Sequence, residues 1–236
     1  MKTKFRFLLL PLLLPLFSPG QSFRIYKSDT INRTDAKGLK QGIWKRYWEN
    51  DTLFSISFLK NGKAIDTSKT FYKTGKPEGI ILNEKDGKHA AATLFHENGK
   101  LKATGFYVDR IKDSTWNYFN EDGKLTAVEG YKTGIKHGTW RVFYENGQLA
   151  EETFWINGKR EGIHHQYFKD GNRKAEIIFK NDTYSGIAKM FHTNSKLWFA
   201  GNYKKGLREG SWVYFNEEGV QDSVEIYRNG ELIPKQ

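Results

Sequence analysis

The side chains that most often carry out catalysis are sparse in this chain. None of the 236 residues is a cysteine, which excludes thiol catalysis and thiolate metal sites. The six histidines are His89, His96, His137, His164, His165 and His192. His164 and His165 are adjacent, so on a strand they point to opposite faces, and the others are dispersed. No glycine-rich phosphate loop and no serine elbow is present. We therefore expect no enzyme, no cofactor and no metal site.

Aromatic side chains at a regular spacing are the residues best suited to binding. Tryptophans recur at multiples of 24 residues from Trp44, and a second, mostly aromatic column begins at Leu59. If the two columns share one face, their rings form a strip that could stack on sugars or receive an extended peptide. The alternative is that these rings only pack together as a structural ladder. The candidate binding strip consists of Trp44, Trp116, Trp140, Trp155, Tyr203 and Trp212.

A single period of 24 residues organises the whole chain. From Tyr47, every step of 24 reaches another ring, and from Gly42 the same step reaches a glycine or another short residue. A stretch that repeats without insertion is one supersecondary unit copied end to end. We assign the Tyr47 column to holding the sheet together, with each ring contacting its equivalents one repeat away. This ring column consists of Tyr47, Phe71, Phe95, Phe119, Phe143, Tyr167, Phe191 and Phe215.

The fifth repeat shows what the unit is. Two runs rich in aromatic and β-branched residues end in Asn146-Gly147 and Asn157-Gly158, and Asn-Gly between such runs is the strongest short-range hairpin signal. Nothing between them has the period of a helix. The sequence therefore predicts an all-β fold: an elongated, single-layer antiparallel β-meander of eight 24-residue β-hairpin repeats over residues 42–233, with about 16 strands.

The turns also predict a register. A two-residue turn at Asn146-Gly147 would place Trp140 opposite Thr153 and Phe143 opposite Ala150. It would also place the Gly42 column beside the Leu59 column, so that a ring can lie over a glycine of the neighbouring strand.

The two ends of the chain differ from the repeats. Residues 1–22 have a basic start, an apolar run and small residues near Gly20 and Ser22, which is typical of a cleaved signal peptide. No cysteine follows, so a lipoprotein is excluded, and we expect an exported protein, periplasmic, surface-bound or extracellular. Residues 23–41 read as a degenerate repeat that caps the array, and residues 234–236 as a tail that stops strand pairing.

The charge of the chain allows anionic partners without identifying one. Removing the three basic residues of the leader leaves 35 Lys and Arg against 27 Asp and Glu, a net charge of +8. This balance can attract acidic polysaccharide or lipid head groups. The basic residues are spread through the repeats without an evident cluster, which favours a solvated surface, and export argues against nucleic acid.

The repeat resembles the MORN repeat in its bacterial second variant, over residues 23–233. The pattern Gly-x-Trp-x-x-(Phe/Tyr), followed by Asn-Gly, is legible at 42–47, 138–143 and 210–215, and the lead-in at 31–42 resembles secreted proteins of Bacteroidetes-like bacteria. The resemblance implies an elongated β-meander that serves as a protein-interaction scaffold. Some members are proposed to bind phospholipid, and bacterial relatives are often labelled antitoxin-like. Repeats two to four depart from the pattern, with Ser68 and Ala92 in place of tryptophan.

These observations leave a ranked set of functions. The leading hypothesis is an exported, non-catalytic scaffold that binds a protein partner in the cell envelope. The alternatives are a binder of polysaccharide or anionic phospholipid through an aromatic and basic face, and an antitoxin-like binding protein. The sequence does not fix the oligomeric state.

Overall fold

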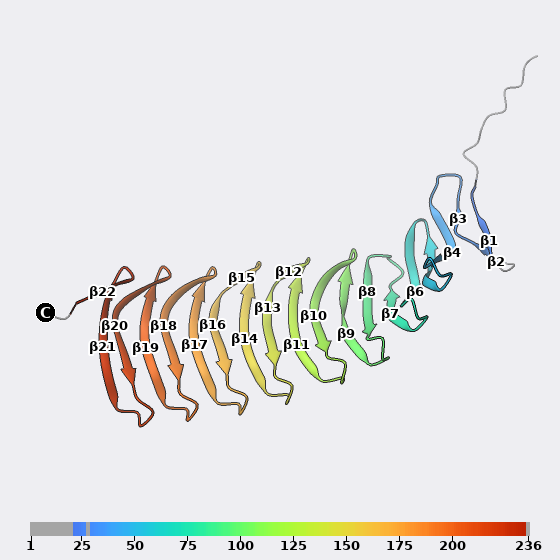
Figure 1. The fold of residues 1–236 in the computed structure, drawn as a ribbon. Coiled ribbons are helices and arrows are strands. Elements are labelled where there is room, and N and C mark those ends of the chain that lie inside the picture. Colours follow the sequence, from blue (N-terminus) through green and yellow to red (C-terminus); the bar gives the residue numbers. More distant parts are fainter. Residues whose placement is uncertain (1–20, 27–28, 235–236) are drawn as a thin grey trace, which may run out of the picture.

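The protein is one long antiparallel sheet whose strands follow one another in chain order (Figure 1). The computed structural model describes residues 21–26 and 29–234, and this part of the chain contains strands and turns but no helix. The sheet runs from β3 (Arg33–Thr34) to β22 (Glu231–Ile233) and is open. The predicted all-β meander of repeats is confirmed.

Each repeat contributes a hairpin of two strands. The first strands are β4 (Lys40–Tyr47), β6 (Lys63–Phe71), β8 (His89–Phe95), β10 (Ile111–Phe119), β13 (Gly138–Phe143), β16 (Gly162–Tyr167), β18 (Thr183–Phe191) and β20 (Leu207–Phe215). The second strands are β5 (Leu53–Lys60), β7 (Pro77–Asn83), β9 (Leu101–Val108), β11 (Leu125–Lys132), β14 (Leu149–Ile156), β17 (Arg173–Lys180), β19 (Leu197–Lys204) and β21 (Gln221–Arg228).

The sheet has more strands than the sixteen predicted, because two repeat strands are interrupted and both ends are extended. The short strands β12 (Ile135–Lys136) and β15 (Lys159–Arg160) are the separated beginnings of β13 and β16. At the first interruption the His137 N–H donates to the Gly130 carbonyl. The histidine therefore lies in a strand irregularity and not in a turn.

The Gly42 column is explained by backbone conformation. Gly42, Gly138 and Gly210 have φ values of 69°, 78° and 75°, the left-handed region that glycine adopts without strain. The column does pair with the Leu59 column, as in Gly42 with Leu59 and Gly138 with Trp155. The idea that a ring covers these glycines is wrong, since a Cβ at any of these three would meet nothing within 4 Å.

A bulge near each first turn changes the predicted register. Trp140 pairs with Thr153 as expected, but Phe143 pairs with Leu149 and not with Ala150. The second strand carries one extra residue there, and a bulge of this kind shifts every side chain beyond it to the other face. The same shift recurs between Arg46 and Tyr47 in the first repeat.

At five of the seven junctions between repeats, a ring side chain just after the first strand bonds to the next repeat. Trp48 donates from Nε1 to the Phe71 carbonyl at 3.0 Å, and Tyr144 from its hydroxyl to the Tyr167 carbonyl at 2.7 Å. In each bond the donor and acceptor are 23 residues apart, and the acceptor is a ring-column carbonyl. The members of this ladder are Trp48, Tyr72, His96, Tyr144 and His192.

The segment before the array lies against its first strand. Strands β1 (Arg24–Tyr26) and β2 (Asp29–Ile31) form a separate pair. Asn32 then bonds to β4, because its N–H donates to Ile43 O and its amide donates to Lys45 O. Ile31 is fully buried. The predicted signal peptide at 1–22 falls almost entirely outside the described residues.

Among the described residues, the structure contains no helix of the length and apolarity needed to span a bilayer.

Candidate functional site

One face of the sheet carries the tryptophan column and the Leu59 column, and we call it the tryptophan face. Its rings contact across columns: Trp212 packs edge-on against Tyr203, with ring centroids 5.0 Å apart, and also contacts Tyr227. Equivalent rings are two strands apart, about 10 Å. For the tryptophan column, contact is therefore made with rings of the intervening strands and not between equivalent residues.

A row of basic side chains covers these rings. Lys136 lies over Trp140 and Trp155, with Nζ 4.1 and 4.3 Å from the ring centroids, and Arg208 lies over Trp212 at 4.3 Å. The sequence-based view that basic residues do not cluster is wrong, because Lys or Arg occupies six of the eight positions that lie two residues before a repeat. This cation row consists of Lys40, Lys88, Lys112, Lys136, Arg160 and Arg208.

Two of the six predicted binding residues have no exposed surface. Trp116 and Trp212 are both 0% exposed. Each lies on a glycine eleven residues earlier, since a Cβ on Gly105 or Gly201 would come within 2.1 Å of the indole. These indoles are therefore part of the core of the sheet.

The eighth repeat shows the completed arrangement around such an indole. Arg208 donates to the Tyr227 hydroxyl at 2.8 Å, and Tyr214 and Tyr227 both donate to Glu225 Oε2, at 2.7 and 2.8 Å. Burial, together with the bond to Glu225, raises the pKa of Tyr214 to about 12. The hydrogen bonds from the two tyrosines lower the pKa of the Glu225 carboxyl. The network joins a cation, a carboxylate and two tyrosine hydroxyls, whereas the buried Nε1 of Trp212 has no hydrogen-bond partner among the described residues.

The fourth repeat builds nearly the same arrangement 96 residues earlier. Lys112 lies over Trp116, Tyr118 and Tyr131, and Tyr131 donates to Glu129 Oε2 at 2.8 Å. Burial raises the pKa of Tyr131 to about 12. The tryptophan face is thus filled where cation, tryptophan and tyrosine occur together.

The other predicted binding residues are half-buried. The indole N–H of Trp44 donates to Arg33 O at 3.2 Å, and that of Trp140 donates to Gly130 O at 2.8 Å. Trp155 lies 5.7 Å from Trp140, and Tyr203 stacks on Tyr184 at 5.0 Å. The structure places all six residues on one face, and a binding role for them stays a prediction.

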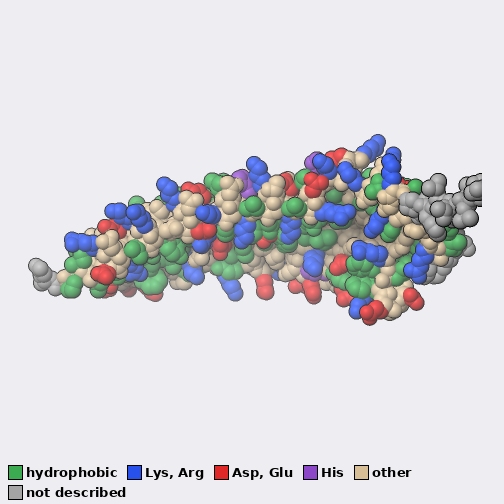
Figure 2. All heavy atoms as spheres, turned by 90° about the horizontal axis from the view of Figure 1, so that it is seen from above, with side chains coloured by type: hydrophobic (Ala, Val, Ile, Leu, Met, Phe, Trp, Pro, Cys, Tyr) green, Lys and Arg blue, Asp and Glu red, His purple; other side chains and the backbone are tan. Residues whose placement is uncertain are grey.

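The tryptophan face is hollowed at the second repeat. In this repeat, small side chains replace the cation and both rings. Ala64 stands at the cation position, Ser68 at the tryptophan position and Asn83 at the position of the second ring. They line a cleft of about 490 Å³. Four basic side chains also line it, and no acidic side chain does. These four residues are Lys40, Arg46, Lys88 and Arg110. In Figure 2, Lys and Arg side chains lie along the whole length of the molecule, with Asp and Glu side chains among them.

Three of the histidines form hydrogen bonds within the sheet. His164 occupies a tryptophan position in the sixth repeat, is buried, and lies 2.7 Å from the Thr153 hydroxyl through Nδ1. Burial lowers its pKa. His96 and His192 donate to backbone carbonyls of the next repeat.

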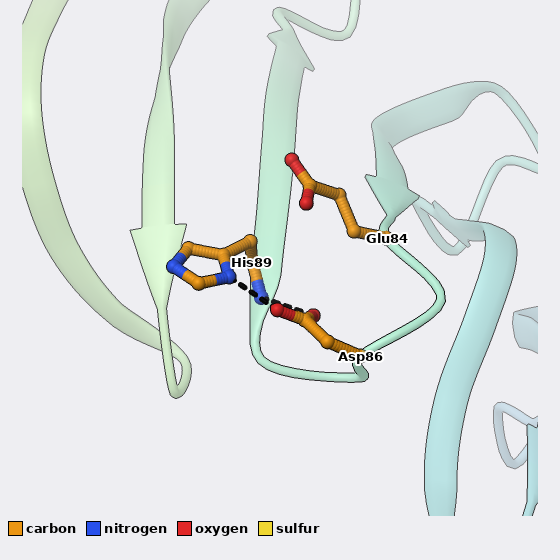
Figure 3. Close-up of side chains that lie close together, drawn as sticks. All are labelled: Glu84, Asp86 and His89. Atoms are coloured by element: carbon orange, nitrogen blue, oxygen red, sulfur yellow. Dashed lines mark hydrogen bonds and ion pairs between the residues drawn. The ribbon is translucent and has the colours of Figure 1, made fainter.

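Glu84, Asp86 and His89 form a group whose ligand atoms lie within 4.8 Å of one another (Figure 3). Asp86 accepts hydrogen bonds from the His89 ring and from the backbone N–H groups of Lys88 and His89. These bonds lower the pKa of the Asp86 carboxyl, and the carboxylate raises the pKa of His89. The group is the loop between β7 and β8, and its internal bonds account for its geometry.

The opposite face carries an exposed apolar stripe, which the sequence analysis missed. It follows the two columns next to the tryptophan columns, beginning at Ile43 and Phe58, which pair across β4 and β5. The side chains are 41–56% exposed. The large apolar members of this stripe are Ile43, Phe58, Leu82, Phe154, Ile163, Ile187 and Ile226. Alternation along the strands, counted from the tryptophans, would have revealed it.

The fold defines a tandem β-hairpin repeat protein. The family described as "MORN repeat variant" matches residues 40–61, 88–109, 136–157 and 184–205. The chain therefore belongs to the MORN repeat proteins. The four matches are 48 residues apart, and the intervening hairpins repeat the same strands. No curated protein matches the chain. MORN repeats are a non-catalytic family that generally binds proteins or membrane lipids.

Proposed function

We propose that this chain is an exported, non-catalytic scaffold that binds a protein partner in the cell envelope through the opposite face of its sheet. The apolar stripe carries the proposal. Seven large apolar side chains, spaced along the length of the array, keep 41–56% of their surface in water. Exposed apolar side chains that recur along one face favour an interaction site.

The stripe is framed by charges that would orient a partner. Arg141 and Glu152 form an ion pair of 2.6 Å on the same face, and Lys189 lies 3.5 Å from Glu176. An apolar centre with a polar rim is the usual anatomy of a protein interface. The regular row of apolar side chains suits a folded partner or a long helix better than a small molecule.

Export rests on the leader at residues 1–22, and the described residues add a preference for its cleavage site. Ser22 O accepts from the Thr34 N–H at 2.8 Å, and the two hydroxyls lie 2.6 Å apart. Cleavage after Gly20 keeps these contacts and cleavage after Ser22 removes them. We therefore expect mass spectrometry of the exported protein to show a first residue of Gln21.

The scaffold is tested by capture from an envelope extract with the purified mature chain. The informative variant is Ile163→Thr combined with Ile187→Thr, because threonine stands in this column at Thr67, Thr115 and Thr139 and so suits the sheet. We expect the variant to keep its melting temperature and to lose the captured protein.

The matched control is Thr139→Ser, which changes the same column without removing apolar surface. Capture that persists unchanged in the double isoleucine variant would contradict the proposed face. Capture that fails for the wild type as well, with retention on anionic vesicles instead, would favour the lipid-binding alternative.

A further inference from the structure

We infer that the cleft in the second repeat is a binding site for an acidic saccharide, a short stretch of sugar rings that carry carboxylates. The site lies on the tryptophan face, away from the apolar stripe, and goes beyond the proposed scaffold function. It is a position in the array where the structural stack is absent and a ligand takes its place.

The cleft lies where other repeats place a stack of a cation, a tryptophan and a tyrosine. In the eighth repeat, Arg208, Trp212 and Tyr227 fill this position, and Trp212 lies on Gly201. The second repeat offers Ala64, Ser68 and Asn83, with Ser57 at the position of the glycine. Strands β4 to β7 keep their pairing throughout, so the backbone does not collapse into the space. The volume of about 490 Å³ is that of a small-ligand site.

The four basic side chains that line the cleft favour an anionic ligand. Among the residues that the structure describes, Lys40, Arg46, Lys88 and Arg110 have no carboxylate within 4 Å, although six other Lys and Arg side chains do. Arg46 donates only to the Ser55 hydroxyl, and Lys40 lies over Trp44. Four unpaired cations around one hollow create a positive potential that a multiply charged anion neutralises.

The aromatic walls of the cleft favour a ligand that contains a ring. Trp44 stands on one side, in the first repeat, and Tyr107 on the other, in the third, and both are half-buried. A sugar ring has an apolar face that packs on an aromatic ring. The floor adds hydroxyl and amide groups from Ser55, Ser57 and Asn83, which suit a ligand rich in hydroxyls.

Other anions fit this cleft less well. An extended acidic peptide would bind by adding a strand, but β5, β6 and β7 are paired on both sides, so no sheet edge is free here. A lipid would need a continuous apolar slot for its chains, whereas this cleft intersperses Leu59 and Ile81 with serines and an asparagine. An acidic sugar uses the rings, the cations and the hydroxyls together.

The test is isothermal titration calorimetry of the full mature chain with trigalacturonic acid as the probe. Maltotriose, a neutral trisaccharide, controls for ring stacking alone, and inorganic phosphate controls for charge alone. We expect binding of trigalacturonic acid that weakens at high salt, and much weaker binding of both controls. Phosphate binding as tight as the binding of trigalacturonic acid would overturn the proposal.

Two kinds of variant locate the site. Lys88→Ala and Arg110→Ala should each weaken binding roughly tenfold, since each removes a hydrogen bond to a charged group. Lys136→Ala changes the same column as Lys88 two repeats away, and should leave binding unchanged. The variant Ser57→Gly with Ser68→Trp rebuilds the missing stack and should abolish binding.

Several results would contradict the site. Loss of binding in Lys136→Ala equal to that in Lys88→Ala would assign the effect to overall charge. Binding to vesicles of anionic phospholipid, blocked by Lys88→Ala, without binding of trigalacturonic acid would assign the cleft to lipid. If the rebuilt stack fails to fold, the two alanine variants still decide. Loss of the saccharide site with unchanged protein capture would leave the scaffold function standing.

Discussion

The second and the eighth repeats are the same hairpin with opposite contents on the tryptophan face. In the eighth, Trp212 lies on Gly201 beneath Arg208 and is wholly buried. In the second, Ser68 stands at the same position above Ser57, and a cleft remains. Both repeats keep their strands and their turns. The difference teaches that backbone pairing, and not the ring stack, is what every repeat must have.

The comparison separates residues that stabilise the array from residues that are free to vary. A filled repeat gains the burial of an indole and a satisfied network of charges, while an empty repeat presents unpaired cations to water. Repeats that contact only their neighbours can differ in this way without disturbing the rest, because the stability of such an array is nearly a sum over repeats.

The largest expected effect on stability comes from removing a buried tryptophan. Trp212→Ala should lower the free energy of unfolding by about 3–5 kcal/mol, the usual cost of deleting a buried tryptophan. Trp44→Ala, which truncates a half-buried ring beside the cleft, should cost about 1–2 kcal/mol. Urea unfolding followed by circular dichroism measures both. Equal losses would show that Trp44 and Trp212 do not differ in burial as the structure indicates.

Trp140→Ala is the intermediate case and decides what the predicted binding strip does. Trp140 is half-buried and lies under Lys136. A loss of stability near that of Trp212→Ala would assign the strip to the structural ladder. Near-normal stability together with a loss of partner capture would assign it to binding.

The next effect concerns the glycine beneath the indole. A Cβ at Gly201 would come within 2.1 Å of Trp212, so Gly201→Ala must displace the ring. We expect a loss of about 1–3 kcal/mol, typical of overpacking. The matched control is Ser57→Ala in the same column, where no tryptophan lies above. A neutral Gly201→Ala would mean that the indole moves without cost.

Much of this organisation is predictable from the sequence. The 24-residue period, the hairpins, the turn at Asn157-Gly158 and the pairing of Gly42 with Leu59 follow from residue types and spacing. The predicted two-residue turn at Asn146-Gly147 is wrong, because the Tyr144 N–H donates to the Gln148 carbonyl and so encloses three residues. The bulge that pairs Phe143 with Leu149 does not, because strand alternation and turn length cannot indicate an extra residue. The cation row is periodic and was detectable from Lys40 onward.

The cleft could not be predicted in the same way, because it is defined by side chains that are missing. Ser68 and Asn83 look like worn copies of a consensus when the repeats are compared in sequence alone. Only the positions of Trp44 and Tyr107 on either side show that their small size leaves a space. Likewise, the need for a glycine at Gly105, beneath Trp116, becomes evident only when the two strands are paired.

A smaller effect is expected from filling the second repeat. The variant Ser57→Gly with Ser68→Trp should raise the free energy of unfolding by up to about 2 kcal/mol, since it buries an indole in existing space. Ser68→Trp alone should gain less, because Ser57 then lies where the glycine belongs. Differential scanning calorimetry of the single and double variants measures this coupling. A double variant no more stable than Ser68→Trp would contradict the role given to the glycine.

The smallest effect comes from the sixth repeat, where the tryptophan position holds a group that titrates. Burial lowers the pKa of His164 in the folded chain, whereas the unfolded histidine takes up its proton near its ordinary pKa of 6.5. The unfolded state therefore binds more protons just below pH 6.5, and the free energy of unfolding falls as the pH is lowered through this range. His164→Phe should remove that dependence, measured as the difference between wild type and variant in urea midpoints across mildly acidic pH. His89 supplies the opposite sign, because Asp86 raises its pKa, so its contribution is present at low pH and is lost as the pH rises. If His164→Phe leaves the acid dependence as it is, the histidine is not buried as the indole of the eighth repeat is.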